Sequence, residues 1–294
     1  LGIFSALVGR YDLIVADRLA HATIIDGAKL SGARLERFAH NDVSDLENIL
    51  RNERATRPRS SILVVTESVF SMDGDLAPLS EIIALCERYE ALSVVDEAHA
   101  LGVFGPVGDG LLAEEGLRDR VSITIGTLGK SFAAYGGFVA SSGPIIKLLT
   151  SRARTFLYST ALPPAVAAAA VAAIELVRQD GSLGKRLLGL SAGFTDQLKV
   201  QLQEQLKELL PQIEPVIIGK SQSQIIPIVI GDNAQALEIA ESLESRGVIA
   251  TAIRPPTVPV GTARLRLSVS LMHDQQMLTR VAQEIANVIG EVRS

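Results

Sequence analysis

The sequence has one cysteine, no long apolar run and no excess of basic residues, and each absence excludes a class of protein. The single thiol, Cys86, cannot form an internal disulfide and fits a reducing compartment, so we expect a cytoplasmic protein. The longest apolar candidate, residues 161–177, is interrupted by Pro163 and Pro164, so the sequence predicts no membrane-spanning helix. Because the net charge is −5 and Lys and Arg are scattered, we expect no nucleic-acid partner.

Several chemical motifs are missing as well. One cysteine and scattered histidines lack the spacing of metal ligands, so we expect no metal. The sequence has no Walker loop, no G-x-G-x-x-G after a strand and no G-x-S-x-G, and the last absence argues against an α/β hydrolase. Residues 1–8 contain no initiator Met and no cleavage site and read as the middle of a helix, so we expect a chain that lacks an N-terminal part.

The apolar pattern predicts an α/β protein with two domains, 1–180 and 181–294, separated by the break at residues 180–182. In the larger domain we expect buried parallel strands at 13–16, 62–66, 92–96 and 121–125, helices at 22–30, 42–50 and 79–89, and a charged loop at 51–60. In the smaller, α+β domain we expect helices at 187–210, 234–246 and 274–292 and strands at 224–230, 248–253 and 264–268.

Polar residues follow the predicted parallel strands, at the sheet edge where ligands of α/β proteins gather. The candidate site residues there are His21, Ser71, Asp96, His99, Thr127 and Lys130. A lysine in such a crevice can form a Schiff base with a carbonyl compound, of which pyridoxal phosphate (PLP) is the commonest. Asp96 would keep the PLP ring nitrogen protonated, His99 would contact the phenolic oxygen, and Thr127 and Ser131 are candidates to bind the phosphate.

Each candidate also has a purely structural interpretation. Lys130, in its glycine-bounded turn, can also be interpreted as a solvated loop residue. Asp96 can be interpreted as a helix cap, and His99 as a hydrogen-bonded core residue. His21 and Ser71 have the corresponding interpretations of a surface loop residue and a turn serine. Arg264 and Arg266 share one face of a predicted strand, and a buried arginine needs an anion, which is either a substrate carboxylate or a structural acid.

Three motifs, in chain order, resemble the landmarks of the α-oxoamine synthases, a family of fold-type I PLP enzymes. They are Phe70-Ser-Met-Asp-Gly-Asp-Leu-Ala-Pro-Leu79, Val95-Asp-Glu-Ala-His99, and Thr127-Leu-Gly-Lys130 with Gly136-Gly137. The resemblance runs over nearly the whole chain, and residues 252–267 look most like the biotin-pathway member. A phosphate-contacting Ser-Gly-aromatic segment of the family would lie before Leu1, so we expect the chain alone to bind the cofactor weakly.

The resemblance implies the fold, a mostly parallel sheet in a PLP-binding large domain with a smaller α+β domain, and the roles of the site residues. Lys130 would be covalently bound to PLP and would be catalytic together with His21 and His99. Asp96 would pair with the pyridinium nitrogen, His99 would contact the phenolic oxygen and His21 would stack on the ring. Ser71 and Thr127 would complete the cofactor pocket.

The resemblance also implies the substrates and the assembly. Arg266 would bind the carboxylate of L-alanine, which the enzyme, an acyltransferase, would condense with a pimeloyl thioester of acyl carrier protein or coenzyme A, with loss of CO₂, in biotin biosynthesis. The protein would be a homodimer in which Ser159 and Thr160 reach the phosphate bound by the partner subunit. The alternatives are an α-oxoamine synthase resembling glycine C-acetyltransferase or serine palmitoyltransferase, and a non-catalytic paralogue. Loss of Lys130 or Asp96 would favour the paralogue, and both residues are present.

Overall fold

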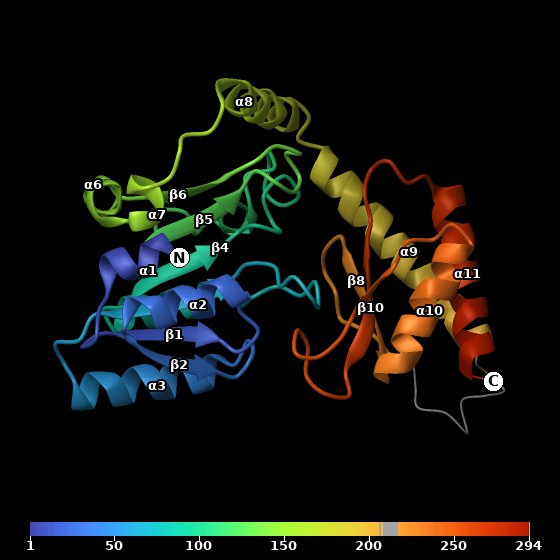
Figure 1. The fold of residues 1–294 in the computed structure, drawn as a ribbon, viewed down its shortest axis with the longest axis horizontal. Helices are drawn as coiled ribbons and strands as arrows, with labels where there is room; N and C mark the ends of the chain where they lie inside the picture. Colours follow the sequence, from blue (N-terminus) through green and yellow to red (C-terminus); the bar gives the residue numbers. More distant parts are fainter. Residues whose placement is uncertain (206, 208–216, 294) are drawn as a thin grey trace. The chain divides into compact units, whose positions relative to one another are not determined.

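The computed structural model describes residues 1–205, 207 and 217–293, which form two compact units (Figure 1). The first unit comprises Leu1–Phe70 and Ala77–Gly184, and the second comprises Ser71–Leu76 and Lys185–Ser294. Residues 71–76 therefore belong with the second unit although they are flanked in sequence by the first. None of the helices in the described ranges is long and apolar enough to cross a membrane.

The first unit is built on a six-stranded sheet with the order β2-β1-β3-β4-β5-β6. The strands are β1 (Leu13–Asp17), β2 (Arg34–Phe38), β3 (Ile62–Glu67), β4 (Leu92–Asp96), β5 (Ile123–Thr127) and β6 (Gly137–Ser141). The first five strands in that order run parallel, and β6 runs antiparallel to β5. The expected α/β fold with a mostly parallel sheet is confirmed.

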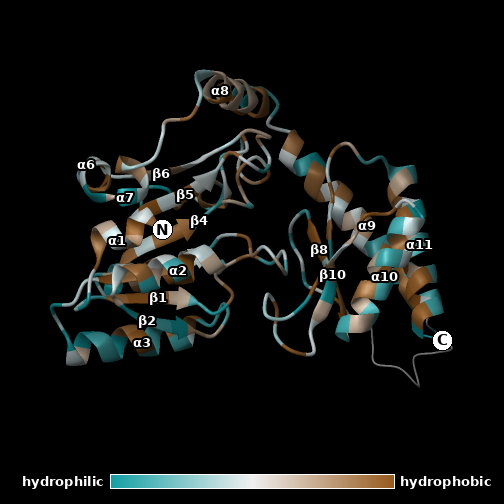
Figure 2. Ribbon diagram, in the orientation of Figure 1, coloured by the Kyte–Doolittle hydropathy of each residue, from teal (hydrophilic) through white to brown (hydrophobic). Residues whose placement is uncertain are grey.

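Helices surround this sheet, and their packing explains the continuous apolar runs of the central strands. They are α1 (Gly2–Leu7), α2 (Ala22–Ser31), α3 (Val43–Thr56), α4 (Leu79–Arg88), α5 (Leu111–Glu114), α6 (Gly143–Arg152), α7 (Arg154–Leu157) and α8 (Pro164–Gln179). Every residue of β1 and β3 is buried, as expected for strands covered on both faces. Figure 2 shows that β1 is hydrophobic, whereas α3, which packs against the edge strand β2, is largely hydrophilic.

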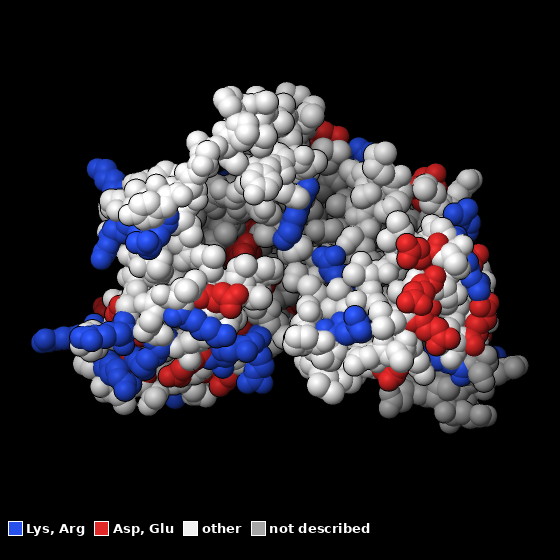
Figure 3. All heavy atoms as spheres, viewed as in Figure 1, with Lys and Arg blue, Asp and Glu red and all other residues white. Residues whose placement is uncertain are grey.

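The expected charged loop at 51–60 is wrong in its first half, because α3 continues to Thr56. The charged side chains of this turn make tertiary contacts. Arg54 donates hydrogen bonds to the backbone oxygens of Tyr89, Ser60 and Glu90 at 2.7, 2.7 and 2.8 Å, and the buried Glu53 pairs with Arg34. On the face shown in Figure 3, basic and acidic side chains are intermixed around α3.

Strand β5 begins two residues later than expected, and Gly126 lies within it rather than in a turn. Gly126 faces Phe138 of β6, and a Cβ at position 126 would lie 2.3 Å from the Phe138 ring. Glycine is needed here because the aromatic ring packs directly on the backbone. Thr127 is consequently the last residue of β5, and the lysine loop begins immediately after it.

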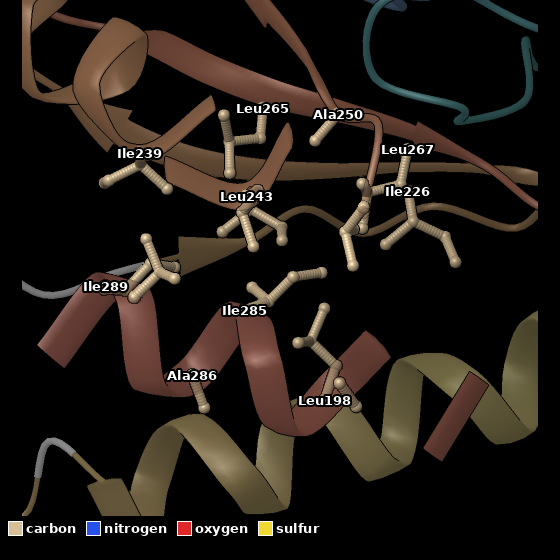
Figure 4. Close-up of a cluster of buried hydrophobic side chains, with 14 of the residues drawn as sticks. Leu198, Ile226, Ile239, Leu243, Ala250, Leu265, Leu267, Ile285, Ala286 and Ile289 are labelled. Atoms are coloured by element: carbon tan, nitrogen blue, oxygen red, sulfur yellow. The ribbon is translucent and has the colours of Figure 1, made fainter. Parts of the chain in front are cut away.

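The second unit is an antiparallel sheet of order β7-β8-β10-β9 with three helices. Its elements are β7 (Ile217–Ile218), β8 (Ile225–Gly231), β9 (Thr251–Ile253), β10 (Ala263–Ser268), α9 (Leu183–Gln205), α10 (Asn233–Ser245) and α11 (Gln275–Arg293). Figure 4 shows the core between them, where Leu198 of α9 and Ile285 of α11 meet Ile226 and Leu265 from the sheet. The expected α+β architecture is confirmed, and the end of the helix expected at 187–210 lies outside the described residues.

Candidate active site

Lys130 lies in a hydrogen-bonded loop directly after β5. Leu128 N–H donates to the Gly136 oxygen, Ala134 N–H to the Leu128 oxygen and Ala133 N–H to the Lys130 oxygen, at 2.9, 2.9 and 3.0 Å. The hydroxyl of Thr127 accepts from Gly129 N–H and lies 3.3 Å from the Gly136 oxygen, to which it donates. The loop therefore fixes the backbone of Lys130 while its side chain remains exposed.

The amine of Lys130 contacts the imidazole of His99. Nζ lies 2.8 Å from Nε2, so one of the two nitrogens donates a hydrogen bond to the other. His99 is in the turn that follows β4, three residues after Asp96, and it is half-buried. Lys130 and His99 are 31 positions apart in sequence, and they are in contact in the structure. The sequence predicted both at the carboxyl edge of the sheet, because each follows a parallel strand.

Asp96 ends β4 with its side chain mostly removed from water. Its Oδ1 accepts a hydrogen bond from Ala98 N–H at 2.9 Å, within a turn and not at a helix N-terminus, so the helix-cap interpretation is wrong. Burial raises the pKa of the Asp96 carboxyl, while Ala98 N–H, Lys130 and His21 act in the opposite direction. A cation placed beside this carboxylate would recover the electrostatic energy that burial removes.

His21 is the N-cap of α2 and is exposed. Its Nδ1 lies 2.8 Å from the Thr23 hydroxyl and 3.3 Å from Thr23 N–H, from which it accepts. Capping fixes the ring at the start of the helix and leaves its faces available for stacking.

Sequence reasoning missed Glu67, the last residue of β3. Its side chain is buried, and Oε1 has no hydrogen-bond partner within the described residues. Burial, with a smaller contribution from the nearby Asp96, raises the pKa of Glu67 to about 8. The available signal was an acid at the end of a continuous β-branched run, which predicts a buried parallel strand.

Ser71 and Arg266 lie in the second unit and contact each other. Arg266 Nε donates to the backbone oxygen of Ser71 at 2.6 Å, and Nη1 donates to the Ser268 hydroxyl at 3.2 Å. Burial lowers the pKa of the Arg266 guanidinium, and no carboxylate in the described part of the chain pairs with it. Arg264, two residues earlier on β10, is buried and pairs with Asp73. The two arginines thus have different partners.

Ser159 and Thr160 follow α7 in the first unit and are both exposed. The Ser159 hydroxyl donates to the Thr155 oxygen at 2.5 Å. Around them, Phe156, Tyr158 and Leu162 expose large apolar side chains.

A cavity of about 920 Å³ in the first unit does not coincide with the lysine site. It lies beside β5 and β6 and is lined by Glu97, Thr124, Phe138 and Ile174 among others, whereas Lys130, Asp96 and His99 do not line it. We place the site by its chemistry, because the cavity walls are mostly apolar.

The lysine loop, the imidazole and the buried acids fit PLP as a ligand. A reactive amine, a carboxylate able to pair with a ring nitrogen and an imidazole near both are the donor set that this cofactor requires. The mostly parallel sheet with the lysine after β5, followed by a smaller α+β unit, defines a fold-type I PLP enzyme. The chain belongs to the family "aminotransferase class I and II", whose model matches residues 1–285.

Comparison with individual proteins narrows the class of PLP enzyme to which the chain is similar. The chain is 45% identical to 8-amino-7-oxononanoate synthase of Anaeromyxobacter dehalogenans over 98% of its own length and 68% of the relative's. It resembles the solved 8-amino-7-oxononanoate synthase of Francisella tularensis with a TM-score of 0.80 and 27% identity, covering 97% of this chain and 78% of the other. It also resembles a serine palmitoyltransferase of S. paucimobilis with a bound PLP–myriocin aldimine, with a TM-score of 0.86 and 31% identity, covering 99% and 70%.

Proposed function

We propose that this chain is a PLP-dependent acyltransferase that condenses L-alanine with a pimeloyl thioester, with loss of CO₂, to form 8-amino-7-oxononanoate for biotin synthesis. The observation that carries the proposal is the 2.8 Å contact between Lys130 Nζ and His99 Nε2 at the strand end where Asp96 lies. The substrates are taken from relatives that bear this enzyme's name at 45% identity.

When bound, PLP supplies an electron sink that stabilises negative charge at the α-carbon of an amino acid. Lys130 would hold the cofactor covalently through Nζ. Asp96 would hold the ring nitrogen in its protonated form, His99 would hydrogen-bond the phenolic oxygen and His21 would cover one ring face. Thr127 and Ser71 would complete the pocket.

Lys130 would act as the general base. Its Nζ, when neutral, would be the base that takes the proton from Cα of the bound amino acid, and His99 next to it would keep the amine oriented. Arg266 would bind the substrate carboxylate through the terminal guanidinium nitrogens, since Nε is already bonded to Ser71. This fixes the amino acid so that the reacting bonds are aligned.

We propose a homodimer in the cytoplasm. The exposed apolar side chains of Phe156, Tyr158 and Leu162 support an interface on this segment. Ser159 and Thr160 would then contact the phosphate held by the partner subunit.

A serine palmitoyltransferase-like activity is the second candidate, favoured by the TM-score of 0.86 to that enzyme against 0.80 to the solved 8-amino-7-oxononanoate synthase. Sequence identity favours the first candidate, at 45% against 31%.

The deciding experiment is a matrix of assays in which L-alanine, glycine and L-serine are each combined with pimeloyl, acetyl and palmitoyl thioesters, with mass-spectrometric detection of product. We expect 8-amino-7-oxononanoate from L-alanine and a pimeloyl thioester, and no product from Lys130→Ala. Product from L-serine and palmitoyl thioester alone would overturn the assignment.

A further inference from the structure

A second carboxyl group, besides that of Asp96, lies among the proposed cofactor residues, and the mechanism above gives it no role. Glu67 ends β3 and stands opposite Asp96 of β4 in the parallel register. Its side chain is 3% exposed, and Oε1 is buried with no hydrogen-bond partner within the described residues. The backbone N–H of His21 also acts on this carboxyl group, in the direction that lowers its pKa. Glu67 is therefore next to both the ring-nitrogen residue and the ring-face residue.

Two neighbouring buried carboxyl groups cannot both ionise without a large electrostatic cost. The groups that act electrostatically on Glu67 are Asp96 on β4, Lys130 after β5 and Asp17 on β1, besides the N–H of His21, and Asp17 itself pairs with His40. Only Lys130 among these is cationic, so the acids are in excess. This arrangement favours the retention of one proton by the pair Glu67 and Asp96.

Local contacts decide which carboxyl keeps the proton. Asp96 is the less buried of the two, accepts a hydrogen bond from Ala98 N–H and is stabilised as an anion by Lys130 and His21. Glu67 is more buried, and its Oε1 has no donor within the described residues. The anion is thus favoured on Asp96 and the neutral acid on Glu67.

We propose that Glu67 is a positioning residue of the cofactor site: it carries the proton that the two carboxyls share, which leaves Asp96 ionised for the ring nitrogen, and it anchors the N-terminus of α2 where His21 lies. This role rests on the proposed use of PLP. The protonation of Glu67 itself is a property of the protein alone and is measurable without cofactor.

Infrared difference spectroscopy at pH 7 tests the protonation directly, because a protonated carboxyl has a carbonyl band that a carboxylate lacks. We expect this band in the difference between wild type and Glu67→Gln. Its absence from that difference would overturn the proposal. Glu53→Gln is the matched control: Glu53 is a second buried acid away from the lysine loop, and although burial opposes its ionisation, its hydrogen bonds with Arg34 and Ser60 lower its pKa, so it contributes no such band at pH 7.

PLP affinity, measured by absorption titration, tests the positioning role. Glu67→Gln keeps a neutral group that can accept from His21 N–H, so we expect a Kd within about threefold of wild type, whereas Glu67→Ala removes the acceptor and should weaken binding about tenfold. Asp96→Asn should weaken it at least as much, and the control Glu53→Gln should leave it unchanged.

The outcomes separate this proposal from the proposed function. Loss of affinity in Glu67→Gln equal to that in Asp96→Asn would mean that a charged Glu67 is required, and an unchanged Kd in Glu67→Ala would remove the positioning role. If the wild-type chain formed no covalent adduct with PLP at Lys130, the proposed function would fail, while the infrared band would still decide the protonation of Glu67.

Discussion

Replacing Asp73 by Asn tests the contact that joins residues 71–76 to the rest of the second unit. The Arg264 side chain is 6% exposed and pairs through Nη1 with Oδ1 of Asp73. Within the described ranges its other partner is Thr262, whose backbone oxygen accepts from Nε at 3.1 Å and whose hydroxyl accepts from Nη2 at 3.2 Å. The substitution leaves a buried guanidinium without a counter-charge.

The expected loss of stability follows from this geometry. Removing one partner of a buried ion pair costs about 3–5 kcal/mol when the other charge remains unpaired. The Asp73 side chain is 31% exposed, so water screens part of the interaction, and the contacts to Thr262 remain. We therefore expect Asp73→Asn to lower the free energy of unfolding by about 2–3 kcal/mol.

Urea unfolding followed by circular dichroism measures this change, with Arg264→Met and the double variant completing a double-mutant cycle. The coupling energy should be about 2 kcal/mol, because the double variant no longer buries an unpaired charge. Glu175→Gln is the control, since its pair with Arg178 has side chains 52% and 61% exposed and should be worth less than about 0.5 kcal/mol. Additive single effects, or an Asp73→Asn change as small as that of the control, would refute the reasoning.

Three further predictions concern the first unit. Burial raises the pKa of Glu67 in the folded chain to about 8, so unfolding releases its proton between about pH 4.5 and 8. As the pH rises through that window, the free energy of unfolding of wild type should fall relative to that of Glu67→Gln, by up to about 1.4 kcal/mol per pH unit. Urea-unfolding free energies of the two proteins that change in parallel with pH would contradict this. Gly126→Ala should lower the free energy of unfolding by about 1–3 kcal/mol, because the new Cβ would lie 2.3 Å from the Phe138 ring. Gly143→Ala is the control and should leave stability unchanged, because nothing lies within 4 Å of a Cβ there. Equal urea midpoints for the two variants would exclude the clash. Borohydride reduction with PLP followed by peptide mapping should label Lys130, and Lys130→Ala should fold normally without the label, since the side chain is exposed; label elsewhere would overturn the assignment.

The parallel sheet and the meeting of Lys130 with His99 were predictable because both follow from local rules. Continuous apolar runs mark strands covered on both faces, and the carboxyl ends of parallel strands share one edge. Residues that follow β4 and β5 were therefore expected to be neighbours, and the 2.8 Å contact confirms this for the amine and the imidazole. Roles toward PLP remain predictions for all the site residues.

Other features depend on contacts between distant residues and could not be predicted. Residues 51–56 continue α3, and within this segment Arg54 and Glu53 have partners on other elements. The charges of these two residues do not identify those partners from the sequence. Gly126 is a strand residue because of Phe138, twelve positions later. The importance of Glu67 depends on an unpaired buried oxygen, which is visible only once β3 and β4 are in register.

The arginines of β10 show how identical residues on one strand face acquire different chemistry. Arg264 is neutralised by Asp73, so its charge serves the structure. Arg266 is held by a backbone carbonyl, which orients the guanidinium without cancelling its charge, while burial disfavours that charge and lowers its pKa. A bound carboxylate would relieve this penalty, so an anionic substrate would restore the electrostatic free energy that burial removes from the Arg266 guanidinium. Exchange of Arg266 for Lys would keep the charge but lose the Nε bond to Ser71, and we therefore expect it to raise the KM for the amino acid more than it lowers kcat.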